Sequence, residues 1–145
     1  AKRLQNVASL EAVERHGAAP DILYCRNEQE ELRQIRRKID AFQSGENVTL
    51  GIILKTNSAA KALYDVLTQS YEVHLISPES ATFATGVSIS SIQMSKGLEF
   101  DEVVLPAANN ETYFTPYDRS LLYIACTRAM HRLSLTYTGE LTRLI

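Results

Sequence analysis

The sequence predicts an α/β domain with three layers, in which helices cover both faces of a mostly parallel sheet. Short apolar runs typical of strands alternate with helical patterns along most of the chain. The run at 48–54, VTLGIIL, is nearly all apolar, as expected for a strand that is buried on both faces. The chain has 145 residues, 45% of them hydrophobic, which suffices for one ordinary core. We therefore expect residues 1–145 to form a single domain.

The first elements follow from periodicity and capping signals. Residues 2–16 carry apolar side chains at three-residue intervals, which predicts an amphipathic helix that ends at Gly17. A short strand is expected at 22–25. Asn27 can cap the next helix, whose first turn is acidic and which should end near Gly45. Four basic residues on this helix could contact phosphates or could form a solvated face that pairs with glutamates. They are Arg33, Arg36, Arg37 and Lys38.

The alternation continues beyond the buried run at 48–54. Asn57 or Ser58 is expected to cap a helix that reaches about Gln69. Pro116 suits the first turn of a further helix, which should run to about Arg128. The remaining strands are expected at 71–76, 87–93, 102–105 and 132–137, with a polar connection at 77–86 and a terminal helix or tail at 139–145.

Charge and cysteine content narrow the function classes. The net charge of −2 and the pI of about 5.9 exclude the global basic surface of a dedicated nucleic-acid binder. Cys25 and Cys126 lie far apart in apolar runs, so two buried thiols are a simpler explanation than a disulfide. There is no CxxC motif or His/Cys cluster, so we expect no metal site. Without a membrane-spanning run or a signal peptide, we expect a cytoplasmic protein.

The first of two informative clusters is the stretch 95–101, SKGLEFD, between two predicted strands. Gly97 permits a tight turn and the close approach of a ligand. Lys96 and Glu99 are three residues apart, so they share a face if the turn is helical. The lysine could meet a phosphate and the carboxylate could accept from a ribose hydroxyl. The alternative is a surface turn with a salt bridge.

The second cluster ends the helix that begins at Pro116. The apolar side chains of this helix should bury one side of it, so that Arg128 emerges at an edge of the sheet. A guanidinium stays charged and presents a planar fork of donors, which suits phosphate oxygens. The alternative is an arginine that complements the dipole at the C-terminus of the helix.

A polar triplet, Lys55-Thr56-Asn57, directly follows the buried run at 48–54. The carboxyl ends of strands in open α/β sheets are where ligands bind. Loop and capping chemistry would also account for Thr56 and Asn57.

Together these segments resemble the second RecA-like domain of UvrD/Rep-type superfamily 1 DNA helicases. Residues 91–103, SIQMSKGLEFDEV, are similar to the family's motif V, T-h-H-x-[AS]-K-G-L-E-F-D-x-V. Residues 117–129, YDRSLLYIACTRA, are similar to motif VI, E-E-R-R-L-x-Y-V-[AG]-x-T-R-A, and 51–57 resembles a strand that ends in R-T-N. The resemblance covers about 22–137 and implies a RecA-like fold in an ATP-dependent DNA helicase.

The resemblance implies a nucleotide site that involves four residues. ATP and Mg²⁺ would be bound mainly by an N-terminal RecA-like domain and would lie in the cleft between the two domains. Arg128 occupies the position of the arginine finger that reaches the γ-phosphate, and such fingers are worth about 10³–10⁵ in rate. Lys96 would lie near the terminal phosphate and Glu99 near the ribose, with Gly97 shaping the turn between them.

The resemblance also implies contact with single-stranded DNA. Gln93 stands where relatives have a histidine that faces the strand, and Lys55, Thr56 and Asn57 stand where they have R-T-N. Gln93 for histidine and Lys55 for arginine are departures, so the contact is expected to be altered. Ser120 likewise replaces an arginine of motif VI.

No large insertion precedes the motif V segment, which brings the chain closest to the compact helicase IV-like and HelD-type branch. HelD members act on RNA polymerase, so an ATP-driven factor that remodels RNA polymerase through protein contacts is the alternative function. The charge balance and Gln93 favour this alternative. A degenerate helicase domain in a nuclease or a regulatory protein is a second alternative.

The sequence contains no G-x-x-x-x-G-K-[ST] phosphate loop and no acidic strand motif for Mg²⁺, which belong to the N-terminal RecA-like domain. We therefore expect the chain to be a fragment of a larger protein. The fragment alone should not hydrolyse ATP.

Overall fold

The computed structural model describes residues 19–79 and 85–145. The helix predicted at 2–16 and the middle of the connection at 77–86 lie outside these ranges. None of the described helices is both long and apolar enough to cross a membrane.

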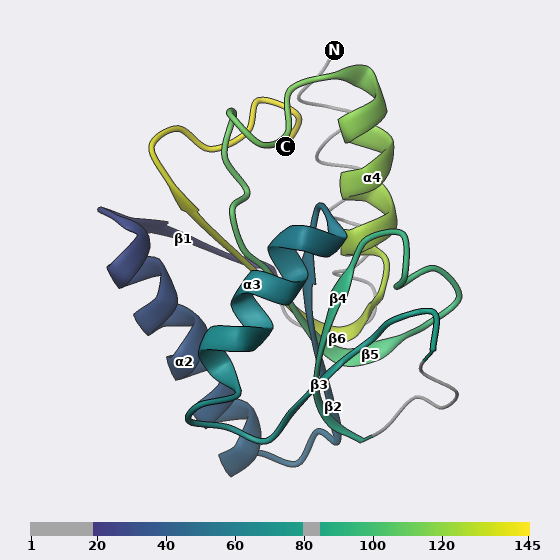
Figure 1. The fold of residues 1–145 in the computed structure, drawn as a ribbon. Helices are drawn as coiled ribbons and strands as arrows, with labels where there is room; N and C mark the ends of the chain where they lie inside the picture. The colour runs from purple at the N-terminus through teal and green to yellow at the C-terminus, as the bar shows by residue number, and fades with distance from the viewer. Residues whose placement is uncertain (1–18, 80–84) are drawn as a thin grey trace.

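The described strands form one parallel sheet with the order β1-β6-β5-β2-β4-β3 (Figure 1). All five strand pairs are parallel, which confirms the predicted sheet type. Every residue of β2 is buried, as its apolar sequence predicts for a central strand. The strands are β1 (Asp21–Cys25), β2 (Thr49–Leu54), β3 (Val73–Leu75), β4 (Gly86–Ser91), β5 (Phe100–Leu105) and β6 (Ala129–Thr138).

Helices cover both faces of the sheet, which confirms the three-layer prediction (Figure 1). The described helices are α2 (Glu28–Ser44), α3 (Asn57–Leu67) and α4 (Pro116–Cys126). One core lies under α2 and α3, where Ile39 and Leu67 meet Ile52 and Ile89. The other lies under α4 on the opposite face. It includes Ile53, Phe100, Leu122, Ala125 and Leu133.

Several boundaries differ from the predicted ones, and three of them have clear local reasons. Asn27 caps α2 as predicted, but the prediction that Asn57 or Ser58 caps α3 is wrong. The cap is Thr56, whose backbone is extended and whose Oγ1 accepts from the Ala59 N–H at 3.1 Å.

Strand β4 ends at Ser91 because the chain turns there, with the Ser95 N–H donating to the Ser91 carbonyl at 3.0 Å. Strand β6 begins three residues earlier than predicted, at Ala129. Its start is fixed by a bond from the Phe100 N–H to the Arg128 carbonyl at 2.9 Å.

Gly51 lets two elements approach closely in the centre of the sheet. A Cβ at this position would lie 2.6 Å from the ring of Phe100, which is fully buried. Only glycine therefore fits on β2 beneath this ring, and the close contact brings the start of β5 into the core under α4.

The terminal residues form a tail that fixes the loop between β5 and α4. Asn109 and Leu141 form an isolated antiparallel bridge. The Thr142 hydroxyl donates to the Tyr113 carbonyl at 2.6 Å, and the Thr142 N–H donates to the Ala108 carbonyl at 3.0 Å. The segment predicted as a terminal helix or tail is thus a tail, in which Leu144 is buried in the core and Leu141 and Ile145 pack against it.

Candidate functional site

The predicted site residues divide between two edges of the sheet. Leu54 pairs with Ser91, so the residues that follow β2 and β4 lie at the carboxyl edge. We call Lys55, Thr56, Asn57 and Gln93 the carboxyl-edge group. Phe100 pairs with Ala129, so the residues that precede β5 and β6 lie at the amino edge. We call Glu99 and Arg128 the amino-edge pair. Lys96 and Gly97 lie in the connection that crosses from one edge to the other.

This connection, 92–99, is a series of turns held from within. Ser95 is fully buried, and its hydroxyl donates to the Ile92 carbonyl at 2.6 Å. The Leu98 N–H then donates to the Ser95 carbonyl at 3.0 Å. Gly97 has a φ of +83°, a left-handed conformation that disfavours any side chain, although nothing lies within 4 Å of where a Cβ would be. Backbone conformation, not space, therefore requires the glycine.

Lys96 and Glu99 are both exposed on this connection. In the part of the chain that the structure describes, no ion pair or hydrogen bond joins their side chains. The segment is therefore a surface turn, as the alternative holds, but no salt bridge within the described residues closes it, and both charged groups face solvent.

Arg128 is half-buried just beyond the C-terminus of α4, and its guanidinium is held by its own chain. Its Nε donates to the Ile124 carbonyl at 3.1 Å, and its Nη2 lies 3.3 Å from the Thr127 hydroxyl. Its Nη1 donates to the Leu98 carbonyl at 3.3 Å. Arg128 therefore closes the last turn of α4, as the dipole alternative anticipates, and also joins this turn to the connection at 92–99.

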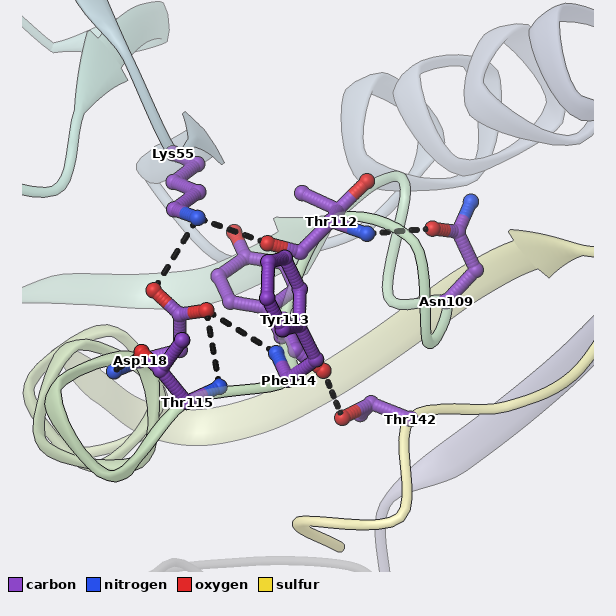
Figure 2. Close-up of polar contacts among 8 residues, drawn as sticks. All are labelled: Lys55, Asn109, Thr112, Tyr113, Phe114, Thr115, Asp118 and Thr142. Atoms are coloured by element: carbon purple, nitrogen blue, oxygen red, sulfur yellow. Dashed lines mark hydrogen bonds and ion pairs between the residues drawn. The ribbon is translucent and has the colours of Figure 1, made fainter.

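Lys55 has internal partners at the carboxyl edge (Figure 2). Its Nζ donates to the Thr112 carbonyl at 2.7 Å and lies 3.0 Å from a carboxylate oxygen of Asp118. The same ammonium lies 5.7 Å from the ring centroid of Tyr113 and 5.8 Å from that of Phe114. Lys55 thus ties the end of β2 to the loop before α4.

Asp118 is a central residue that the sequence reasoning missed. Its side chain is only 3% exposed, and it accepts the N–H groups of Phe114 at 2.9 Å and Thr115 at 3.1 Å (Figure 2). Thr115 and Asp118 form a capping box at the start of α4. The pattern Thr-x-x-Asp was visible in TPYD, 115–118, and would have indicated this cap.

The pKa of Asp118 is lowered by its partners. Burial is the largest single influence and raises the pKa, but the bonds from the Phe114 N–H, Lys55 and Thr115 together outweigh it. The net shift is below the ordinary value, so Asp118 is ionised and paired with Lys55 at neutral pH.

The other members of the carboxyl-edge group are exposed. Thr56 caps α3, and its hydroxyl lies 3.2 Å from that of Ser58. The first turn of α3 has no acidic residue. Asn57 opens this turn, and Gln93 follows the neighbouring strand. The structure therefore brings Thr56, Asn57 and Gln93 to the ends of adjacent strands.

Two further features of the structure lie apart from the residues predicted to bind nucleotide or DNA. An open pocket of about 320 Å³ lies beside the tail and is lined by Asn109, Asn110, Glu111, Thr138, Gly139 and Glu140. Cys25 and Cys126 are both free and buried, which confirms the prediction of two buried thiols. Within 19–79 and 85–145 no group of three or more His, Cys, Asp or Glu side chains is placed to hold a metal ion.

Comparison with known proteins relates this arrangement to helicases. The family model described as UvrD-like helicase C-terminal domain matches residues 86–136, from the start of β4 almost to the end of β6. The C-terminal domain of a possible DNA helicase from Lactobacillus plantarum WCFS1 is 32% identical in sequence. The two structures superpose with a TM-score of 0.82, and the match covers 97% of this chain and 88% of the Lactobacillus chain.

More distant structures share the fold alone. The arterivirus nonstructural protein 10 helicase, solved with DNA, is 12% identical with a TM-score of 0.57, over 90% of this chain and 30% of that one. The UvsW helicase of bacteriophage T4 is 12% identical with a TM-score of 0.52, over 87% of this chain and 50% of that one. No curated protein sequence matches the chain.

The sheet and its helices are those of a RecA-like domain, and the motif segments that meet at Arg128 fall inside the matched region. The chain belongs to the family of UvrD-like helicase C-terminal domains.

Proposed function

We propose that this domain is the second motor domain of an ATP-dependent superfamily 1 DNA helicase or translocase. It would work with an N-terminal RecA-like domain of the same protein, which would hold most of the contacts to ATP and Mg²⁺. The domain alone would be inactive, and the full-length protein would act in the cytoplasm.

The observation that carries this proposal is the junction of the two motif segments. Arg128 bonds to Leu98 through its guanidinium and to the Phe100 N–H through its carbonyl. The candidate finger is therefore fixed against the connection that carries Lys96 and Glu99. A guanidinium held by main-chain carbonyls keeps its position and its charge, as a group that stabilises a phosphoryl-transfer transition state requires.

The connection at 92–99 and the amino-edge pair carry groups that suit a nucleotide. Lys96 and Glu99 are exposed and unpaired within the described chain, so neither must give up an internal partner to bind phosphate or ribose. Arg128 would stabilise negative charge on the terminal phosphate, and Lys96 would contact the same phosphate. Glu99 would accept a hydrogen bond from a ribose hydroxyl. Gly97 would hold the turn between Lys96 and Glu99 in the conformation that aims them.

The carboxyl-edge group would contact single-stranded DNA. Thr56, Asn57 and Gln93 offer hydroxyl and amide groups at the ends of adjacent strands. Lys55 is paired with Asp118, so we expect it to hold the loop before α4 in place and not to neutralise a phosphate of the strand.

The test is ATP turnover by the full-length protein, with and without single-stranded DNA, for wild type and for Arg128→Ala. We expect strong stimulation by DNA, and loss of about 10³–10⁵ in kcat for the variant with little change in ATP affinity. Equal losses in turnover and in ATP binding would contradict the finger role. Turnover by the isolated domain would contradict its dependence on a partner.

A second candidate is a motor domain of a factor that remodels RNA polymerase. It is favoured by the net charge of −2, by Gln93 and by the pairing of Lys55 with Asp118. Turnover that is indifferent to DNA, together with capture of RNA polymerase by the full-length protein, would support this function over the first.

A further inference from the structure

We infer that Thr127 is a positioning residue for the guanidinium of Arg128. The inference rests on the proposed function, because it deepens the finger role given there to Arg128. Thr127 is the C-cap of α4, is partly buried and directly precedes Arg128. Its hydroxyl oxygen lies 3.3 Å from the Nη2 of Arg128. Thr127 would act through this contact and would not touch the nucleotide itself.

The direction of this contact follows from the other neighbours of the Thr127 hydroxyl. The hydroxyl oxygen lies 2.9 Å from the carbonyl oxygen of Tyr123 and 3.0 Å from that of Ile124. A carbonyl oxygen can only accept, whereas a hydroxyl has one hydrogen and two lone pairs. The hydrogen is therefore directed to the helix carbonyls, and a lone pair is left to accept from Arg128. A hydroxyl that only closed the last turn of the helix would need the carbonyls alone.

The contact with Thr127 completes the support of the guanidinium. The Nε of Arg128 donates to the Ile124 carbonyl at 3.1 Å, and its Nη1 donates to the Leu98 carbonyl at 3.3 Å. Two such bonds fix a line through the planar group, about which the group can still turn. The third bond, from Nη2 to Thr127, fixes the plane. Without the Thr127 hydroxyl, the guanidinium would be free to rotate about the line through Nε and Nη1.

The same bonds decide which N–H groups remain for a ligand. A guanidinium carries five N–H groups, and the bonds to Ile124, Leu98 and Thr127 each use one of them. This leaves one N–H on Nη1 and one on Nη2 without an acceptor among residues 19–79 and 85–145. Charge that develops on a phosphate is stabilised only by donors that already point at it. Thr127 therefore sets the direction in which these two N–H groups point.

The experiment compares Thr127→Val, which removes the hydroxyl and keeps the branched shape, with Thr127→Ser, which keeps the hydroxyl. Both variants are made in the full-length protein and assayed for ATP turnover with single-stranded DNA. Thr127→Val should lower kcat by about 10- to 100-fold, because a misplacement of about 1 Å in a reacting group costs about 10²-fold. Its affinity for ADP should be unchanged, whereas its affinity for ADP with vanadate, a mimic of the transition state, should fall by the same factor as kcat. Thr127→Ser should retain the wild-type values.

Thr68→Val is the matched control. Thr68 is the C-cap of α3, which has 11 residues as α4 does, and both caps have the backbone conformation of a right-handed helix. Thr68 is followed by Gln69 and has no arginine to orient, so Thr68→Val should leave kcat unchanged.

A double variant tests whether the Thr127 hydroxyl acts through Arg128. In the Arg128→Ala background, Thr127→Val should change kcat less than about twofold, because no guanidinium is left to position. A further loss of about tenfold in the double variant would show that the hydroxyl acts apart from Arg128 and would overturn the inference.

The remaining outcomes separate this inference from the proposed function. If Arg128→Ala loses turnover but Thr127→Val keeps it, or if Thr127→Ser loses as much as Thr127→Val, the positioning role is overturned and the proposed function stands. Equal weakening of ADP and of ADP with vanadate in Thr127→Val overturns the positioning role as well. Full turnover in Arg128→Ala instead overturns the finger role and the proposed function with it. If Thr127→Val does not fold, Thr127→Ala takes its place in each comparison.

Discussion

Arg128 donates from its Nη1 to the main-chain carbonyl of Leu98 at 3.3 Å, across 30 residues of sequence. Leu98 lies between Gly97 and Glu99, so the residue proposed as the finger is bound to the segment proposed to contact the nucleotide. A displacement of the Leu98 carbonyl would therefore remove one of the hydrogen bonds that hold the guanidinium. This contact makes the turn at Gly97 a determinant of where the guanidinium lies.

Gly97→Ala should therefore lower turnover by the full-length protein as well as stability. The left-handed φ of +83° should cost about 1–2 kcal/mol with a side chain, and relief of that strain would move the Leu98 carbonyl away from Arg128. Gly139→Ala is the matched control, because Gly139 also has a positive φ, +68°, with nothing within 4 Å of where a Cβ would be. Thermal melts should show similar losses for both variants, and ATPase assays a loss for Gly97→Ala alone. Equal turnover in the two would mean that the Leu98 contact does not position Arg128.

The ion pair of Asp118 with Lys55 predicts a dependence of stability on pH. The pKa of Asp118 is below its ordinary value of 3.8, so its stabilising effect is complete above that pH and is lost as the pH falls through the folded-state pKa. Asp118→Asn should destabilise the domain by about 1–3 kcal/mol at neutral pH, because Lys55 and the buried cap lose a charged acceptor. Chemical unfolding of both proteins at a series of pH values measures this difference. It should be constant near neutral pH and shrink below 3.8; a difference that persists unchanged in acid would exclude a role for the charge.

Gly51→Ala should destabilise the fold by about 1–3 kcal/mol through overpacking. The added methyl group would lie 2.6 Å from the Phe100 ring, which is fully buried in the core. Gly45→Ala serves as a control, since the nearest atom to its Cβ would be a carbonyl oxygen at 3.4 Å. Urea denaturation should show a lower midpoint for Gly51→Ala than for Gly45→Ala. Equal midpoints would show that the Phe100 ring can move to make room for the added methyl group.

Neither thiol should react in the folded domain. Burial raises the pKa of Cys126 to about 12, and burial together with the nearby Glu31 and Glu30 raises the pKa of Cys25. At about pH 8 both are therefore protonated as well as inaccessible, and reactivity requires the thiolate. Titration with a chromogenic disulfide should detect no thiol under native conditions and both after unfolding. Rapid native labelling of Cys126 would indicate that α4 opens locally.

Sequence patterns predicted the elements better than they predicted the contacts between them. The run at 48–54 and the Asn27 cap depend on neighbouring residues, and both predictions are confirmed. The pairing of Lys55 with Asp118 joins residues far apart in the chain and depends on which strands are neighbours, which no local pattern reveals. The same holds for the contact of Arg128 with Leu98. The Thr-x-x-Asp cap of α4 was local and could have been predicted, and it would have marked Asp118 as a capping residue.

Helix α4 has Asp118 in its first turn and Arg128 just past its last, so it connects the two edges of the sheet. Its 11 residues span about 16 Å, and a tilt of about 5° about the Asp118 end would displace the far end by about 1.4 Å. A misplacement of about 1 Å in a reacting group can cost about 10²-fold in rate. A small change in the ion pair of Lys55 with Asp118 that tilts the helix would thus displace the Arg128 guanidinium at the other edge.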